Sequence, residues 1–175
     1  YTLTSERVVD ALVAAVRRGV RVRVLLEGGP VGGLSRREAA ALDRLTRAGV
    51  RVRLVDGPRA RFVFHHPKYA VVDDRALVLT ENWEPGGVGG RDNRGWGVRV
   101  DDRRVATDLA ALFERDYGAH DARPWRAVRR NASLRTRPAA DGSYPTRFDP
   151  ERVRAERVRV ITAPGNAERT VVAVV

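Results

Sequence analysis

One pattern occurs twice in the sequence, and this repeat limits the folds that are open to the chain. The stretch RRGVRVRVLLEG at 17–28 returns as RAGVRVRLVDG at 47–57. In each copy a glycine ends a segment whose apolar residues recur at helical spacing, and a strand-like apolar run follows. Two successive helix–strand units predict an α/β fold with a mixed, largely parallel sheet flanked by helices.

The rest of the pattern predicts short strands, one more helix and an irregular C-terminal part. In chain order we expect a helix from Ser5 to Gly19, a strand over 20–27, a helix from Ser35 to Gly49, strands over 50–56, 61–65, 68–73, 76–80 and 96–100, a helix over 103–117, and a strand over 157–163 followed by the start of a helix. Ser35 and Glu38 have the spacing of a capping box, and the pair Asp74-Arg75 suits a hairpin turn. Residues 119–152 are rich in proline and arginine, which is typical of a linker or an extended covering segment.

The composition favours anionic partners and removes several kinds of chemistry. The chain has 33 basic and 22 acidic side chains, a formal net charge of +11. Such a surface favours nucleic acid, anionic lipid head groups or phosphorylated substrates, although a bias toward arginine, alanine and valine explains the charge equally well. The absence of cysteine excludes disulfides and thiolate chemistry, and the three histidines, two of them adjacent, argue against a multi-histidine metal site. No apolar run approaches the ~20 residues that cross a bilayer.

The only lysine of the chain, Lys68, lies two positions after His66. On the predicted strand both side chains leave the same face, so an imidazole and an ammonium lie side by side. Such a lysine can neutralise a phosphate oxygen while the histidine attacks phosphorus or protonates the leaving oxygen. A guanidinium is wider and planar, and fits such a pocket less well. With Asp73 the spacing is H-x-K-x-x-x-x-D; the alternative is a solvated lysine on a strand surface.

The stretch HHPKYAVVDDRALVLTENW (65–83) resembles the HxKxxxxD signature of the phospholipase D superfamily and the G-S-x-N-W-like segment behind it. The segments LTSERVVDALVAAVRRGVRVRVLL and NRGWGVRVDDRRVATDLAALFERDY resemble the elements that precede the motif and close the lobe in that family. The resemblance implies one phospholipase D-like lobe at 1–125 that lacks its first strand and helix. It also implies a linker or covering segment at 126–156 and the start of a second lobe at 157–175, so that the lobes are truncated at both ends.

The resemblance further implies an enzyme in which two such motifs meet at one site. The second motif would come from another lobe of the same chain or from a homodimer partner. One histidine attacks phosphorus to form a phosphohistidine, the other protonates the leaving group, and water or an alcohol completes hydrolysis or transfer without a metal or other cofactor. His66 is then the nucleophile or its acid partner, with the first-lobe position favouring the nucleophile. Lys68 binds the phosphoryl oxygen, and Asp73 mainly steadies the strand.

The chain departs from the family pattern just after the motif. Thr80 and Glu81 stand where the family usually has Gly-Ser, so Asn82 would take the asparagine role toward phosphate and Trp83 the aromatic that often follows. Gly95 stands where a glutamate is common, one that can hold the far nitrogen of the histidine. Two alternatives follow for Glu81: it supplies the missing carboxylate to the imidazole, or it is an exposed residue that begins the loop.

Three other features are not predicted to take part in catalysis. His65 should point away from His66 and pack or face solvent, and His120 should lie at the surface. The glycine-rich loop at 84–95 lacks the residues of a phosphate-binding loop and is interpreted as a mobile loop at the site entrance.

Three functions are compatible with these residues. The first is a phospholipase D-type phosphodiesterase that acts on phospholipid, with an anionic membrane surface as a further partner. The second is a nuclease of the same family that acts on DNA or RNA, which the basic charge also suits. The third is a binding module that keeps the fold but has weak or no catalysis, since Glu81 and Gly95 depart from the pattern.

Overall fold

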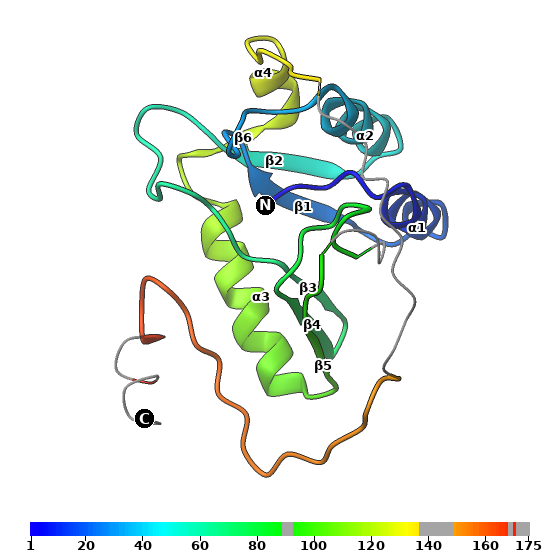
Figure 1. Cartoon of the computed structure of the whole chain (residues 1–175), viewed down its shortest axis with the longest axis vertical. Helices are drawn as coiled ribbons and strands as arrows, with labels where there is room; N and C mark the ends of the chain where they lie inside the picture. Colours follow the sequence, from blue (N-terminus) through cyan, green and yellow to red (C-terminus); the bar gives the residue numbers. More distant parts are fainter. Residues whose placement is uncertain (89–92, 137–148, 168–169, 171–175) are drawn as a thin grey trace.

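The computed structural model describes residues 1–88, 93–136, 149–167 and 170 of the chain. Its elements are α1 (Glu6–Arg17), β1 (Arg23–Glu27), α2 (Arg36–Arg47), β2 (Arg51–Val55), β3 (Tyr69–Val72), β4 (Arg75–Leu79), β5 (Gly97–Val100), α3 (Arg103–Tyr117), β6 (Ala122–Pro124) and α4 (Trp125–Arg129). The strands form two three-stranded sheets, in the orders β1-β2-β6 and β3-β4-β5, with helices beside them (Figure 1). The predicted α/β class is confirmed.

The direction of strand pairing differs between the repeat and the rest of the chain. β1 and β2 are parallel, from Arg23 opposite Arg51 to Glu27 opposite Val55. The other pairings between the described strands, β2–β6, β3–β4 and β4–β5, are antiparallel. A parallel pair needs a long crossover such as α2, whereas a short turn can only join antiparallel strands. The parallel character predicted from the repeat is therefore confined to the repeat itself.

The ends of the first two helices follow from single residues. Gly19 and Gly49 adopt φ values of +88° and +100°, which glycine reaches without strain, just after α1 and α2 end. Ser35 Oγ accepts a hydrogen bond from the Glu38 N–H at 3.0 Å, as its spacing predicts. The Glu38 side chain does not complete a capping box here; its Oε1 accepts the N–H of Leu3 at 3.2 Å instead.

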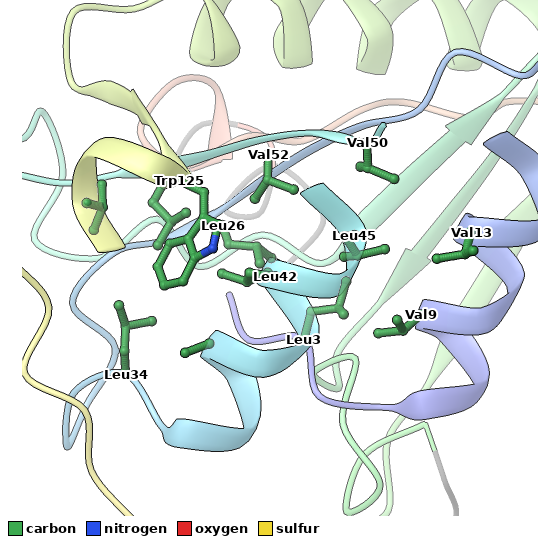
Figure 2. Close-up of a cluster of buried hydrophobic side chains, with 13 residues drawn as sticks. Leu3, Val9, Val13, Leu26, Leu34, Leu42, Leu45, Val50, Val52 and Trp125 are labelled. Atoms are coloured by element: carbon green, nitrogen blue, oxygen red, sulfur yellow. The ribbon is translucent and has the colours of Figure 1, made fainter. Parts of the chain in front are cut away.

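Two apolar cores of very different size stabilise the sheets. The larger core has 13 buried residues and lies between the β1-β2-β6 sheet and helices α1, α2 and α4; Figure 2 shows Leu45 of α2 toward Val9 and Val13 of α1, and Leu42 beside Leu26. The smaller core has three buried residues, Ala76, Val105 and Leu109, where α3 packs on the β3-β4-β5 sheet. Most of the apolar stabilisation therefore belongs to the first sheet.

The N-terminal residues connect the two sheets. Trp83, which follows β4, donates its N–H to Thr2 O at 3.1 Å and accepts the N–H groups of Thr4 and Ser5 at 2.9 Å. On the other side, the N–H of Glu27 at the end of β1 donates to Tyr1 O at 3.3 Å. Residues 1–5 thus bring the end of β1 close to the segment that contains the lone lysine.

The strand predicted over 61–65 does not form. The two N–H groups that the structure pairs in this segment bond to side chains: Arg61 N–H donates to Asp121 Oδ2 at 2.8 Å, and His65 N–H donates to Glu27 Oε2 at 2.6 Å. The alternating apolar pattern alone could not reveal that buried carboxylates, rather than a neighbouring strand, would satisfy this backbone.

Two further predictions differ from the structure in their position along the chain. The hairpin turn lies at Asp73-Asp74 rather than at Asp74-Arg75, and Arg75 already pairs with Val72. Asp73 adopts φ +51°, a left-handed conformation that aspartate tolerates better than most residues. The turn thus lies one residue earlier than predicted, where Asp73 adopts the left-handed conformation.

Among the described residues, the C-terminal part of the chain has more regular secondary structure just after α3, and less over 157–163, than the sequence predicts. Within the stretch predicted to be a linker or covering segment, β6 and α4 form, and Trp125 is 1% exposed in the larger core. No strand forms over 157–163, where the described residues have no strand partner. A helical turn does begin at Ala167, and residues 137–148 of the predicted linker lie outside the described residues. None of the described helices is both long and apolar enough to span a bilayer.

Candidate active site around His66 and Lys68

His66 and Lys68 lie in contact, in the extended segment that leads into β3. Lys68 Nζ lies 2.8 Å from His66 Nε2 and 2.9 Å from Nδ1, and it donates to His66 O at 2.8 Å. Lys68 O accepts the N–H of Leu79 at 2.8 Å, so Lys68 extends the β3–β4 pairing although the strand begins at Tyr69. The spacing of two along an extended chain therefore places both groups on one side, as predicted.

The two side chains differ in their access to solvent. Lys68 is 6% exposed, whereas His66 is exposed. In the described part of the chain no carboxylate forms an ion pair with the Lys68 ammonium, whose close partners are the neutral imidazole and a carbonyl oxygen. A buried cation that has only neutral partners carries an unneutralised charge, which is costly. An anion that reaches His66 would neutralise the charge of Lys68.

The charges around the pair act on both pKa values. Partial burial and the neighbouring Lys68 ammonium lower the pKa of His66 below 6.5. The imidazole therefore stays neutral, with a free lone pair, to lower pH than an isolated histidine. Burial also lowers the pKa of Lys68, and the more distant carboxylates of Glu81 and Glu84 oppose this shift.

Tyr1 forms an aromatic wall beside the pair. Its ring centroid lies 4.5 Å from that of His66 in an edge-on arrangement, and Lys68 Nζ lies 5.0 Å from the Tyr1 ring centroid. The Tyr1 hydroxyl accepts the N–H of Val31 at 2.7 Å, which holds the ring in place. Phe64, partly exposed, lies edge-on to Tyr1 at 6.2 Å and extends the wall outward.

The segment after β4 contributes a polar group of its own. Asn82 Nδ2 donates to Glu84 Oε1 at 3.1 Å, and Thr2 Oγ1 donates to Glu84 Oε2 at 3.4 Å. Asn82 Oδ1 is buried and accepts no hydrogen bond from the described residues. Asn82 is thus held by Glu84 near the lysine, with one oxygen left without a donor.

Glu81 does not contact the imidazole. Its side chain lies against Gly95, so closely that a Cβ on residue 95 would overlap Glu81 Cγ and lie 2.8 Å from both Cδ and Oε1. Among the described residues no carboxylate contacts the His66 ring, so the histidine's hydrogen-bond partner is Lys68. Glu81 instead acts on Lys68 through its charge, and it fills the space that a side chain at position 95 would need.

His65 points into the protein, opposite to His66. It is 6% exposed, and its Nε2 lies 3.7 Å from Asp116 Oδ2 on α3, while Nδ1 is buried without a partner among the described residues. Burial lowers the pKa of His65, against the opposing effect of Asp116. Packing, one of its two predicted roles, is therefore what the structure assigns to His65.

The remaining predicted residues lie away from the pair. Asp73 is exposed in the hairpin turn at the far end of β3 from Lys68. Trp83 is half-buried and packs against the larger core. His120 is exposed, and its Nε2 lies 3.2 Å from Arg59 O. The predicted entrance loop falls partly on residues 89–92, which lie outside the described residues.

Three residues near the pair were missed from the sequence: Tyr1, Glu27 and Glu84. Glu27 had a signal, because it is a charged residue at the carboxyl end of a strand predicted to be buried, where functional groups of α/β proteins gather. Tyr1 and Glu84 had none, because their proximity to the pair depends on the contacts between residues 1–5 and Trp83. The described residues contain no cluster of three or more His, Cys, Asp or Glu side chains that could hold a metal ion.

Known proteins are similar to this chain in sequence and in fold. Residues 1–117 match the family model described as cardiolipin synthase, PLD-like domain. Among solved structures, the chain is similar to Nuc from Salmonella typhimurium, a phospholipase D family member, with 21% identity and a TM-score of 0.59 over 71% of this chain and 76% of Nuc. It is also similar to NucT from Helicobacter pylori, with 17% identity and a TM-score of 0.56 over 71% of this chain and 77% of NucT. At these identities the likeness concerns the fold. No curated protein matches the chain.

Proposed function

The chain belongs to the cardiolipin synthase, PLD-like domain family, and from this premise we propose that it cleaves phosphodiesters through a covalent intermediate on His66. The observation that supports the proposal is the contact between an exposed imidazole and a buried ammonium, 2.8 Å apart, on the only lysine of the chain. The imidazole supplies a neutral nucleophile, and the ammonium supplies a charge for the phosphate oxygens.

The proposed reaction has two steps. A lone pair of the His66 ring forms a bond to phosphorus, and the bond from phosphorus to the leaving oxygen breaks with its electron pair. An acid protonates that oxygen; the family resemblance implies a second motif histidine, from another lobe or from a homodimer partner. Water or an alcohol then attacks phosphorus and gives its proton to the conjugate base of that acid, and the phosphorus–nitrogen bond breaks with its electron pair on nitrogen, which restores His66 and the acid. Lys68 would pair with a non-bridging oxygen throughout, since its charge has no carboxylate partner in the described site.

A phospholipid is the first candidate substrate. The matching family model is described as a cardiolipin synthase domain. Beside the pair, Val63 is 89% exposed and Phe64 is 44% exposed, and Phe64 contacts Tyr1, which contacts His66. Exposed apolar side chains next to a phosphate-binding group suit a substrate whose phosphate is joined to acyl chains.

A nucleic acid is the second candidate substrate. The formal net charge of +11 favours a polyanion, and such a charge raises association rates at low salt. The two candidates rest on features of different extent. The basic side chains that favour a nucleic acid occur along the whole chain, whereas the apolar side chains that favour a phospholipid are only a few residues. The two candidates share the same chemistry at His66 and differ in what binds around it.

The experiment compares His66→Asn with His120→Asn in the full-length protein. Both changes remove an exposed histidine, but only the first removes the proposed nucleophile. Cleavage is measured on vesicles of phosphatidylcholine and phosphatidylglycerol and on single-stranded DNA, with and without a chelator. We expect His66→Asn to lower kcat/KM about a thousandfold or more and His120→Asn to change it less than twofold. Chelator should have no effect under the proposed mechanism.

Each outcome of this comparison has a distinct meaning. Equal activity of the two variants would contradict the role of His66. Cleavage of only one substrate class selects between the two candidates. A wild-type protein that binds vesicles or DNA but cleaves neither would reject the enzyme and leave the binding module. Mass spectrometry of rapidly quenched wild-type protein should find a phosphoryl adduct on the peptide that contains His66.

A further inference from the structure

The carboxylate of Glu27 is buried under the segment that carries His66. Glu27 is the last residue of β1 and is 6% exposed. Its Oε2 accepts the N–H of His65 at 2.6 Å, and its Oε1 accepts the N–H of Gly29 at 2.7 Å. One side chain thus binds the backbone of two loops, one on each side of the strand end.

These contacts are unusual for a chain so rich in arginine. In the described part of the structure the Glu27 carboxylate forms no ion pair, and its two hydrogen bonds are to backbone N–H groups. A buried carboxylate is costly unless both oxygens are hydrogen-bonded, and bonds from N–H groups to a charged oxygen are stronger than neutral ones. The arrangement is stable because Glu27 holds the backbone, and the backbone in turn solvates Glu27.

The backbone of the segment that Glu27 binds is held by separate hydrogen bonds: besides the bond to Glu27, Arg61 N–H donates to Asp121, and Lys68 Nζ donates to His66 O. Residues 61–67 form no strand, so no ladder of hydrogen bonds positions them. Arg61 is held by Asp121, and the His65 ring faces Asp116. His65 directly precedes His66, so the position of the His65 backbone sets the position of the His66 Cα and thus of its ring. On the N-terminal side of the proposed nucleophile, the bond from His65 N–H to Glu27 is the closest one along the chain, and on His66 itself Lys68 Nζ donates to the backbone oxygen.

The anchor itself is rigid. β1 pairs with β2 along its whole length, and Glu27 lies opposite Val55 of β2, which is 1% exposed. The Glu27 N–H also donates to Tyr1 O, and the Tyr1 ring contacts His66. The backbone and side chain of Glu27 therefore hold two neighbours of His66, Tyr1 and His65.

We propose that Glu27 is a positioning residue for His66, which transfers the rigidity of the first sheet to the reacting imidazole through the His65 N–H. This inference rests on the proposed function, because it gives Glu27 a role in the step in which His66 attacks phosphorus. Glu27 does not touch the substrate in this scheme. Its contribution is to keep the His66 ring beside Lys68 before the substrate arrives.

The test replaces Glu27 by glutamine, which has the same shape but turns one oxygen into an N–H donor that faces a backbone N–H. Asp43→Asn is the matched control, because Asp43 accepts the Trp125 Nε1–H at 2.7 Å on the side of α2 that faces α4, away from His66. In the full-length protein we expect Glu27→Gln to lower kcat about 10- to 100-fold with KM within twofold, and Asp43→Asn to leave both unchanged. Glu27→Asp keeps the charge, but its shorter side chain reaches only one of the two N–H groups. Its kcat should therefore lie between those of the wild-type protein and Glu27→Gln.

A second measurement does not depend on activity. The His66 ring can be titrated by NMR, with its signal assigned from its absence in His66→Asn. We expect the pKa of His66 to rise toward 6.5 in Glu27→Gln, because a displaced ring is less buried and lies farther from the Lys68 ammonium. If Glu27→Gln fails to fold, Glu27→Asp is measured in the same two ways.

The outcomes separate the two proposals. A folded Glu27→Gln protein with the wild-type kcat and the wild-type pKa of His66 would overturn the positioning role. The positioning role would also be overturned if Glu27→Gln and Asp43→Asn lost the same fraction of kcat, because this would indicate general destabilisation. If the wild-type protein cleaves nothing, the proposed function fails, and the shift of the pKa of His66 alone then decides whether Glu27 positions the ring.

Discussion

The larger half of the molecule, β1, β2 and β6 with α1, α2 and α4, differs sharply from the smaller half, β3, β4 and β5 with α3. The first buries 13 core residues and the second three. Lys68 leads into the smaller half, whereas Glu27 ends a strand of the larger half. The proposed site therefore takes its reactive groups from the thinly packed half and its buried anchor from the densely packed one.

Polar contacts rather than apolar packing join α3 to the first sheet. Arg23 of β1 forms a two-bond ion pair with Glu114 of α3. Arg53 of β2 donates to Tyr117 O at 2.7 Å, and the Tyr117 hydroxyl donates back to Arg51 O at 3.0 Å. Such contacts fix the orientation of α3 without a continuous apolar core.

The comparison predicts a large difference in the cost of core truncation. Leu42 in the larger core is fully buried, and Leu109 in the smaller core is 6% exposed. We expect Leu42→Ala to lower the free energy of unfolding by about 4 kcal/mol and Leu109→Ala by about 2 kcal/mol, because the thinner core can relax into the cavity. Chemical denaturation measures both. Equal losses would show that the halves are equally well packed, and the comparison would fail.

The second prediction concerns the shape of the cation in the smaller half. Lys68→Arg keeps the charge but places a planar, wider group in a site that is 6% exposed. We expect kcat/KM to fall about a hundredfold, which corresponds to about 2.7 kcal/mol of transition-state stabilisation. The control is the reverse exchange, Arg103→Lys, at the start of α3, where the side chain is 83% exposed and no change is expected. An active Lys68→Arg protein would contradict the role given to this lysine.

The smallest expected effects come from two glycines, one in each half. A Cβ on Gly28 would lie 2.6 Å from Val55 O of β2, whereas a Cβ on Gly95 would collide with the side chain of Glu81. Backbone in a sheet cannot move, but a side chain can, so we expect Gly28→Ala to cost about 2 kcal/mol and Gly95→Ala about 1 kcal/mol. Thermal denaturation measures both.

A double-mutant cycle sharpens the second of these values. If the cost of Gly95→Ala arises from Glu81, it should disappear in the presence of Glu81→Ala, and the two changes should be strongly non-additive. An additive result would mean that the overlap with Glu81 is relieved without cost. It would also mean that Gly95 matters for another reason.

The sequence predicted the local structure well where one short-range signal decides it. The helix over 103–117 forms with these bounds, and Asp102, directly before it, accepts the N–H groups of Arg104 and Val105. The repeat predicted α1, β1, α2 and β2 with errors of only a few residues at the strand starts. The contact between His66 and Lys68 also followed from the spacing, because alternate residues of an extended chain lie on one side.

The predictions were wrong where a strand needed a partner that the sequence does not name. The segments 61–65 and 157–163 both have strand-like composition and form no strand. A strand is stable only when its backbone bonds to a neighbour, and that neighbour is chosen by the tertiary structure. The alternatives left open for Glu81 were undecidable for the same reason, because its position depends on the space left by Gly95.

By itself the sequence determined the helices α1, α2 and α3, which face of each of them is apolar, and that one imidazole and one ammonium lie together. These follow from hydrogen bonds and side-chain spacings within a few residues of the chain. Only the tertiary structure decided what surrounds that pair: Tyr1 against the ring, Glu27 under the backbone and Glu84 on Asn82. These contacts join residues far apart in the chain, and they form because burying the larger core brings β1, the N-terminal residues and the loop after β4 together.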